Sequence, residues 1–163
     1  MATTDAAVTA PRFRTSPFLR AGVLAAGVVG VDQLTKHTVV SGIAIGDHEQ
    51  LVPGIKLVHV RNTGVAFGFL SSGGALVLVF TFVALALLVG YFVTHPRRRG
   101  LWVPTGLLVG GALGNLIDRL ANGAVTDFIK LPHWPAFNVA DMAITFGVLA
   151  LVYVLETGRG RGT

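Results

Sequence analysis

The stretch GALVLVFTFVALALLVGYFVT, residues 74–94, carries no charged side chain and is followed directly by HPRRR, residues 95–99. A helix needs about 20 consecutive apolar residues to cross a bilayer core of roughly 30 Å. The stretch is therefore predicted to be a transmembrane helix that ends at a basic, proline-containing turn. Because cytoplasmic loops of membrane proteins are enriched in Lys and Arg, the three arginines predict a cytoplasmic position for this turn.

The composition of the whole chain agrees with that interpretation. Of the 163 residues, 52% are hydrophobic and 13% are charged, which is typical of a membrane protein. The formal net charge of +5 comes from arginines beside apolar segments, so membrane orientation explains it and no nucleic-acid partner is expected. The chain has no cysteine, which excludes disulfides, thiolate metal sites and a cysteine nucleophile.

Three further apolar segments, residues 18–40, 101–116 and 138–155, predict a membrane domain of four transmembrane helices over residues 18–157. Four spans put both termini on the cytoplasmic side with the basic turn. The flanking residues 1–17 and 158–163 are predicted to be cytoplasmic tails, the first of them disordered. The arginines on the cytoplasmic side would then be Arg12, Arg14, Arg20, Arg97, Arg98, Arg99, Arg159 and Arg161.

The third span is rich in glycine at spacings that would let a neighbouring helix approach closely. These glycines are Gly106, Gly110, Gly111 and Gly114.

Residues 41–72 interrupt the membrane pattern between the first two spans. Pro53 and Gly54 predict a turn, and residues 55–61 alternate partly between apolar and polar side chains, as a half-buried strand does. A small sheet outside the bilayer is expected here.

Two aspartates, Asp127 and Asp141, stand at the edge of strongly apolar sequence. A carboxylate beside hydrocarbon is unfavourable unless it is paired, protonated or facing water, so such acids are candidates for function. Two carboxylates in one site can share a proton, so that one activates water while the other donates a proton to the substrate. The alternative is structural: Asn138 and Asp141 resemble a helix capping box, and Asp127 could be a solvated loop acid.

Other polar residues in the spans are interpreted first as structural. Asp32 and Lys36 stand at i and i+4, which predicts an ion pair on one helix face. Asn115, Asp118 and Arg119 stand at i, i+3 and i+4, which predicts a hydrogen-bonded bridge. The predicted topology brings the acids of these groups, together with Asp127 and Asp141, to the outer face. A proton-conducting or transporting protein, with the acids as a relay, and a purely structural membrane module are the competing hypotheses.

Five motifs, in order across the four spans, closely resemble those of the lipoprotein signal peptidases, also called signal peptidase II. The motifs are VDQLTK at 31–36, RNTGVAF at 61–67, GALGNLIDR at 111–119, VTDF at 125–128 and FNVAD at 137–141. The resemblance covers nearly the whole chain. It implies an aspartyl endopeptidase of the bacterial inner membrane that cuts prolipoproteins just before their lipid-modified cysteine, without a metal or cofactor.

The same resemblance implies a role for each matching residue. Asp127 and Asp141 would be the catalytic pair at the extracytoplasmic face, and Asp32 with Lys36 would be a structural ion pair. The segment between the first two spans would form a β cradle that supports the substrate. Partners would be prolipoproteins and membrane lipid, and a monomer is expected. The residues that would line or support the site are Asn62, Asn115, Asp118, Arg119 and Asn138.

The two aspartates are expected to differ in charge. Asp141 falls in the first turn of a predicted helix, whose partial positive field and free N–H groups favour a negative charge. Asp127 has no such support in the sequence. The shared proton is therefore expected on Asp127.

Overall fold

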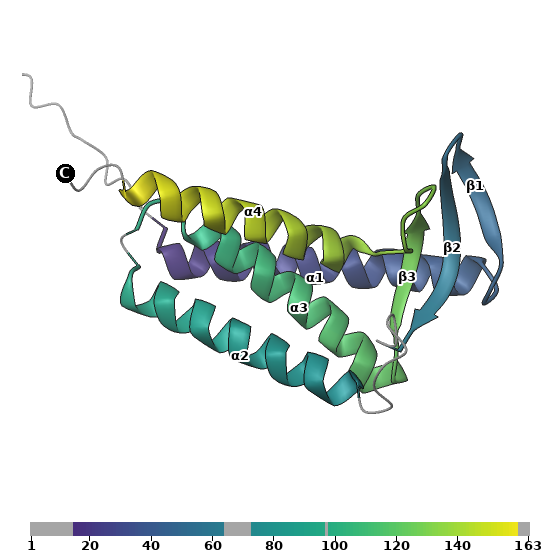
Figure 1. The fold of residues 1–163 in the computed structure, drawn as a ribbon, viewed down its shortest axis with the longest axis horizontal. Coiled ribbons are helices and arrows are strands. Elements are labelled where there is room, and N and C mark those ends of the chain that lie inside the picture. The colour runs from purple at the N-terminus through teal and green to yellow at the C-terminus, as the bar shows by residue number, and fades with distance from the viewer. Residues whose placement is uncertain (1–14, 64–72, 97, 160–163) are drawn as a thin grey trace, which may run out of the picture.

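The structure is a computed structural model that describes residues 15–63, 73–96 and 98–159. Four helices run side by side, and a small sheet lies at one end of them (Figure 1). In chain order the elements are α1 (Pro17–Gly42), β1 (His48–Val52), β2 (Ile55–Asn62), α2 (Gly73–Thr94), α3 (Trp102–Asn122), β3 (Val125–Lys130) and α4 (Val139–Arg159).

The four helices coincide with the four predicted spans, although their ends differ. Helix α1 begins at Pro17, where the Ser16 hydroxyl accepts a hydrogen bond of 3.1 Å from the Leu19 N–H and caps the first turn. Of the predicted disordered tail, residues 1–14 lie outside the described residues. Helix α4 extends to Arg159, so it includes the first two residues of the predicted C-terminal tail, and residues 160–163 lie outside the described residues.

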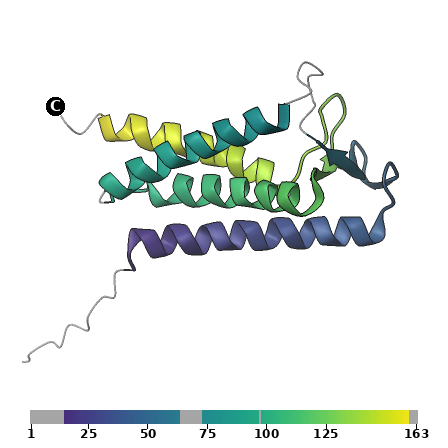
Figure 2. The ribbon, with the colours of Figure 1, turned by 90° about the horizontal axis from the view of Figure 1, so that it is seen from below.

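Two of the described helices, Pro17–Gly42 and Val139–Thr157, are long and apolar enough to cross a membrane, and the apolar stretch Val79–Thr94 of α2 is shorter. Exposed apolar side chains, among them Leu34, Phe80 and Leu87, cover the outside of the bundle. Helix α3 differs because it lies between α1 and α4, as Figure 2 shows from below, and buries glycines and polar side chains there.

The glycines of α3 make this close packing possible, as predicted. A Cβ atom at Gly110 would lie 2.8 Å from the Ala25 carbonyl oxygen of α1, and one at Gly111 would lie 2.5 Å from the Ala140 carbonyl oxygen of α4. Any side chain would therefore push the helices apart. The same holds for the other two predicted glycines, Gly106 and Gly114.

The sheet has three antiparallel strands in the order β1-β2-β3. A turn at Gly54, with φ of 86°, joins β1 to β2 as predicted. The prediction of a sheet formed only between the first two helices is incomplete, because β3 comes from the connection between α3 and α4. Helix α3 ends at Gly123 in the left-handed conformation, and β3 starts two residues later.

Apolar contacts fix the sheet to the end of α1. Phe128 of β3 packs in a buried cluster with Val39 and Ile43. The buried His59 of β2 places its Nδ1 atom 2.8 Å from the Ile43 carbonyl oxygen. The strand that carries Asp127 is thus held against a helix as well as against its neighbouring strand.

A matched pair of glycine substitutions tests the helix contacts. Gly111→Ala is expected to lower stability by about 1–3 kcal/mol, because the new methyl group overlaps the backbone of α4. Gly27→Ala, at an exposed position with nothing within 4 Å of a new Cβ, should be neutral or slightly stabilising. Thermal unfolding of both variants in detergent measures the difference, and equal unfolding temperatures would contradict the close α3–α4 contact.

Candidate active site

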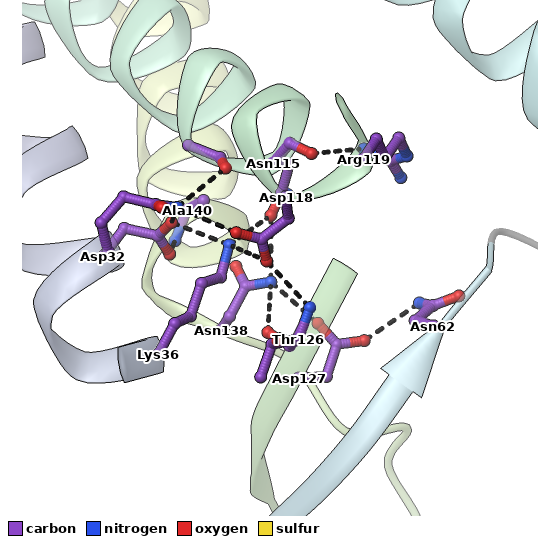
Figure 3. Close-up of polar contacts among 12 residues, drawn as sticks. Asp32, Lys36, Asn62, Asn115, Asp118, Arg119, Thr126, Asp127, Asn138 and Ala140 are labelled. Atoms are coloured by element: carbon purple, nitrogen blue, oxygen red, sulfur yellow. Dashed lines mark hydrogen bonds and ion pairs between the residues drawn. The ribbon is translucent and has the colours of Figure 1, made fainter. Parts of the chain in front are cut away.

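A continuous polar cluster lies where α1, α3 and α4 meet β3, at the sheet end of the bundle (Figure 3). The structure brings nearly all the predicted site residues together there. The members of this polar cluster are Asp32, Gln33, Lys36, Asn62, Asn115, Asp118, Thr126, Asp127, Asn138 and Asp141.

The centre of the polar cluster is a buried ion triad. The Lys36 ammonium lies 2.8 Å from Asp32 Oδ2, as predicted for the i,i+4 pair, and 3.1 Å from Asp118 Oδ2 on α3. All three side chains are buried. Burying charges is unfavourable unless they are paired and hydrogen-bonded, and here one cation serves two carboxylates from different helices.

Backbone N–H groups complete the bonding of the two carboxylates. Asp32 Oδ1 accepts a hydrogen bond of 2.8 Å from the Ala140 N–H, in the first turn of α4. Asp118 Oδ2 accepts one of 2.9 Å from the Thr126 N–H, in β3. The ion triad therefore fixes the start of α4 and the strand of Asp127 relative to α1 and α3.

Gln33 also joins the polar cluster, although nothing in the sequence singled it out. Its Nε2 atom donates to Asp118 Oδ1 at 3.0 Å and to the Gly114 carbonyl oxygen at 3.1 Å. Of the bridge predicted among Asn115, Asp118 and Arg119, the structure shows only the contact between Arg119 and Asn115 among the described residues. Asp118 pairs with Lys36, whereas the Arg119 guanidinium donates to the Asn115 carbonyl oxygen at 3.3 Å.

Asn115 links the ion triad to Asp141. Its side-chain oxygen accepts hydrogen bonds of 3.0 Å from Lys36 Nζ and of 3.0 Å from Asn138 Nδ2. Because a lysine ammonium can only donate, it fixes which end of the amide faces it. The Asn115 Nδ2 atom then points to Asp141 and donates to its Oδ1 at 2.8 Å.

Asn138 caps α4 and contacts both candidate aspartates. Its Oδ1 accepts a hydrogen bond of 2.9 Å from the Asp141 N–H, and its own N–H donates to Asp141 Oδ2 at 3.3 Å. This reciprocal arrangement is the capping box considered above. The Asn138 Nδ2 atom also donates to Asp127 Oδ1 at 2.8 Å. Asn138 thus contacts the Asp127 carboxylate through its side chain and the Asp141 carboxylate through its backbone N–H, so a capping role and a role in the site coexist.

Asp127 is a buried strand residue, so the hypothesis of a solvated loop acid is wrong. Asp127 is only 2% exposed. Its Oδ2 atom accepts a hydrogen bond of 3.0 Å from Asn62 Nδ2 on the neighbouring β2. Burial raises the pKa of Asp127 to about 6; the Asn62 hydrogen bond lowers the pKa and the negative charge of Asp141 raises it.

The arrangement provides two carboxylates with different surroundings. The pKa of Asp127 is raised to about 6, mainly by burial, whereas Asp141 accepts hydrogen bonds from Asn115 Nδ2 and from the Asn138 N–H at the start of α4. Such a pair can hold one proton between them. Over residues 15–63, 73–96 and 98–159, no group of three or more His, Cys, Asp or Glu side chains is placed to hold a metal ion.

Comparison with known proteins supports one family. Residues 24–156 match the profile of the family described as signal peptidase (SPase) II. The chain is 42% identical over 132 residues to a lipoprotein signal peptidase of Thermodesulfovibrio yellowstonii, covering 76% of this chain and 85% of that protein. It is 40% identical over 146 residues to the lipoprotein signal peptidase of Moorella thermoacetica, covering 88% of this chain and 95% of that one.

Two solved structures of bacterial membrane enzymes share the fold of this chain. A bacterial membrane enzyme determined by the in meso method at 1.9 Å resolution superposes with a TM-score of 0.77 at 34% identity, over 83% of this chain and 91% of that one. A second such enzyme, at 2.3 Å resolution, superposes with a TM-score of 0.78 at 32% identity, over 88% and 91% of the two chains. With four helices, a three-stranded sheet and this similarity over most of its length, the chain belongs to the signal peptidase II family of aspartic-type peptidases.

Proposed function

We propose that this signal peptidase cuts lipid-modified prolipoproteins just before their lipid-modified cysteine, with Asp127 and Asp141 as its catalytic pair. The observation that carries the proposal is that one residue, Asn138, hydrogen-bonds both carboxylates: its side-chain amide donates to Asp127 and its backbone N–H donates to Asp141. The relatives are lipoprotein signal peptidases, which indicates the class of substrate.

The proposed reaction starts with Asp141 ionised and Asp127 protonated. Ionised Asp141 takes a proton from water as the water oxygen attacks the scissile carbonyl carbon, and protonated Asp127 gives its proton to the carbonyl oxygen. The resulting diol collapses when Asp127 takes back that proton. Asp141 then protonates the leaving nitrogen, the C–N bond breaks, and both aspartates return to their starting states.

The remaining members of the polar cluster are proposed to position this pair. Asn62 and Asn138 hold Asp127 through its two oxygens, and Asn115 holds Asp141. The Asp32–Lys36 pair is structural and acts through its contacts with Asn115 and Asp118. Arg119, which bonds only the Asn115 carbonyl oxygen among the described residues, supports the end of α3 near the site.

We propose that all four helices cross the bacterial inner membrane and that the sheet lies outside it. The first described residues of α1 and the end of α4 lie together at the end of the bundle away from the sheet (Figure 1), which agrees with two cytoplasmic termini. That same end of the bundle carries Arg20, Arg98 and Arg99. The sheet then forms an extracytoplasmic cradle for the substrate beside Asp127. Because one chain supplies every residue of the polar cluster, a monomer is expected to be active.

The competing proton relay is less well supported. A relay would place its acids at different depths along the helices. Asp32, Asp118, Asp127 and Asp141 instead belong to one hydrogen-bonded cluster at the sheet end of the bundle. This favours a site open to one face over a path across the membrane.

Neutralising either candidate aspartate tests the pair. Asp127→Asn and Asp141→Asn are each expected to lower cleavage of a purified lipid-modified prolipoprotein by at least about 10²–10⁴-fold, because each removes a proton-transferring group. Asp47→Asn, at an exposed position outside the polar cluster, is the matched control and should retain normal turnover. Near-normal cleavage by either dyad variant would refute the assignment.

The pH dependence tests the protonated state of Asp127. Because its pKa lies at about 6, kcat/KM should fall as the pH rises through that value and the proton is lost. The hydrogen bond from Asn62 lowers this pKa, so Asn62→Ala should move the falling limb to higher pH. The apparent values belong to the coupled pair. Asn122→Ala, an exposed amide at the end of α3, is the control; a limb that stays in place or moves down in Asn62→Ala would contradict the assignment.

Cysteine labelling tests the orientation. The chain has no cysteine, so Gln50→Cys in β1 and His95→Cys after α2 each provide one site. In intact cells an impermeant thiol reagent should label the first variant and not the second, and both should react once the membrane is opened. Labelling of position 95 in intact cells would show that the true topology is the reverse of the proposed one.

A further inference from the structure

A basic cavity of about 710 Å³ opens at the helix ends opposite the sheet. It lies between the start of α1 and the turn that joins α2 to α3. Three arginines, Arg20, Arg98 and Arg99, line it together with Phe18 and Trp102. No residue of the polar cluster takes part in it.

An apolar groove continues from this basic cavity along α1. The groove has a volume of about 420 Å³ and shares Thr15, Arg20 and Trp102 with the basic cavity. Its remaining walls are the aliphatic side chains of Leu19, Val23 and Leu24. The basic cavity and the apolar groove thus meet at Thr15, Arg20 and Trp102.

The arginine charges are not neutralised by the described part of the protein. Both ion pairs found there involve Lys36, and no acidic side chain among the described residues lines the basic cavity. Arg20 donates from Nε to the neutral Thr15 hydroxyl at 2.7 Å. The two cavities therefore have a positive charge without a counter-ion among these residues.

Arg98 differs from the other two arginines because its guanidinium is already hydrogen-bonded to backbone carbonyl groups of α4. Its NH2 group donates to the carbonyl oxygens of Val154 at 3.2 Å and Leu155 at 2.9 Å, near the end of α4. It also lines a neighbouring cavity with Glu156. Among the described residues, Arg20 and Arg99 are consequently the arginines of the basic cavity that are available to an anion.

We propose that the basic cavity and the apolar groove together bind one anionic phospholipid. Its phosphate would lie between Arg20 and Arg99, and one acyl chain would follow Leu19 and Val23. Basic pockets between membrane helices on the cytoplasmic side suit anionic headgroups, and tryptophan suits the level where headgroup and chain meet. Residues 1–14 are a poorer occupant, because their nearest charged residues, Arg12 and Arg14, are also cations.

Tryptophan quenching by brominated lipid tests this site directly. The chain has two tryptophans, so a Trp134→Phe background leaves Trp102 as the only reporter. In mixed micelles at low salt, phosphatidylglycerol with brominated chains should quench Trp102 at a lower mole fraction than brominated phosphatidylcholine does. High salt should reduce this preference.

Variants identify the residues responsible. Arg20→Gln and Arg99→Gln should each reduce the preference for the anionic lipid about fivefold, the effect expected for one basic residue. Arg20→Lys, which keeps the charge, should retain most of it. Lys56→Gln, which removes one charge from the sheet at the other end of the molecule, is the matched control and should leave the preference unchanged. Thermal unfolding in detergent alone confirms that each variant is folded.

Three results would overturn the proposal. Equal quenching by the two lipids, or an unchanged preference in folded Arg20→Gln and Arg99→Gln, would show that the arginines select no anionic lipid. Loss of the preference on adding soluble glycerol 3-phosphate would indicate a site for free phosphate. Strong quenching that appears only after residues 2–14 are deleted would show that the N-terminal segment occupies the cavities. Cleavage activity enters none of these readouts, so they are independent of the proposed function.

Discussion

The buried Lys36 ammonium is the contact on which the rest of the molecule depends. It lies between Asp32 of its own helix and Asp118 of α3, and it also donates to Asn115. An unpaired charge buried at this depth would be strongly destabilising, so α1 and α3 can come together only in an arrangement that satisfies all three ions. Since Asp32 Oδ1 accepts from an N–H of α4 and Asp118 Oδ2 also accepts from an N–H of β3, the same requirement positions the two elements that carry the candidate aspartates.

Close helix packing and the polar cluster depend on each other. A Cβ atom at Gly114 would lie 2.6 Å from Asp32 Oδ2, so this glycine gives the carboxylate its space as well as letting α3 approach. A wider gap would admit water between α1 and α3 and weaken the electrostatic attraction of the ion triad. The small residues of α3 therefore contribute to the charge network as much as to van der Waals contact.

Sequence reasoning predicted the features that depend on spacing within one element. The Asp32–Lys36 pair, the glycine face of α3 and the Asn138 cap all follow from helical periodicity. It missed β3, whose backbone partners lie on β2, far away in the chain. It also grouped Asp118 with Asn115 and Arg119 and missed the ion pair of Asp118 with Lys36. Adjacent helical positions point about 100° apart, so Asp118 faces α1 while Arg119 is turned aside, and only the packing of α1 shows that Lys36 is closer.

The different surroundings of the two aspartates also originate in the ion triad. Lys36 donates to the Asn115 oxygen, which turns the Asn115 amide nitrogen toward the Asp141 carboxylate. Asp127 receives its donors from two neutral amides, Asn62 and Asn138, while burial and the charge on Asp141 oppose its ionisation. The charge of Lys36 also lowers the pKa of Asp127, so this lysine acts on Asp127 through its charge and contacts Asp141 through Asn115. Such a site requires five elements, α1, β2, α3, β3 and α4, in fixed register, which explains why its motifs are spread along almost the whole chain.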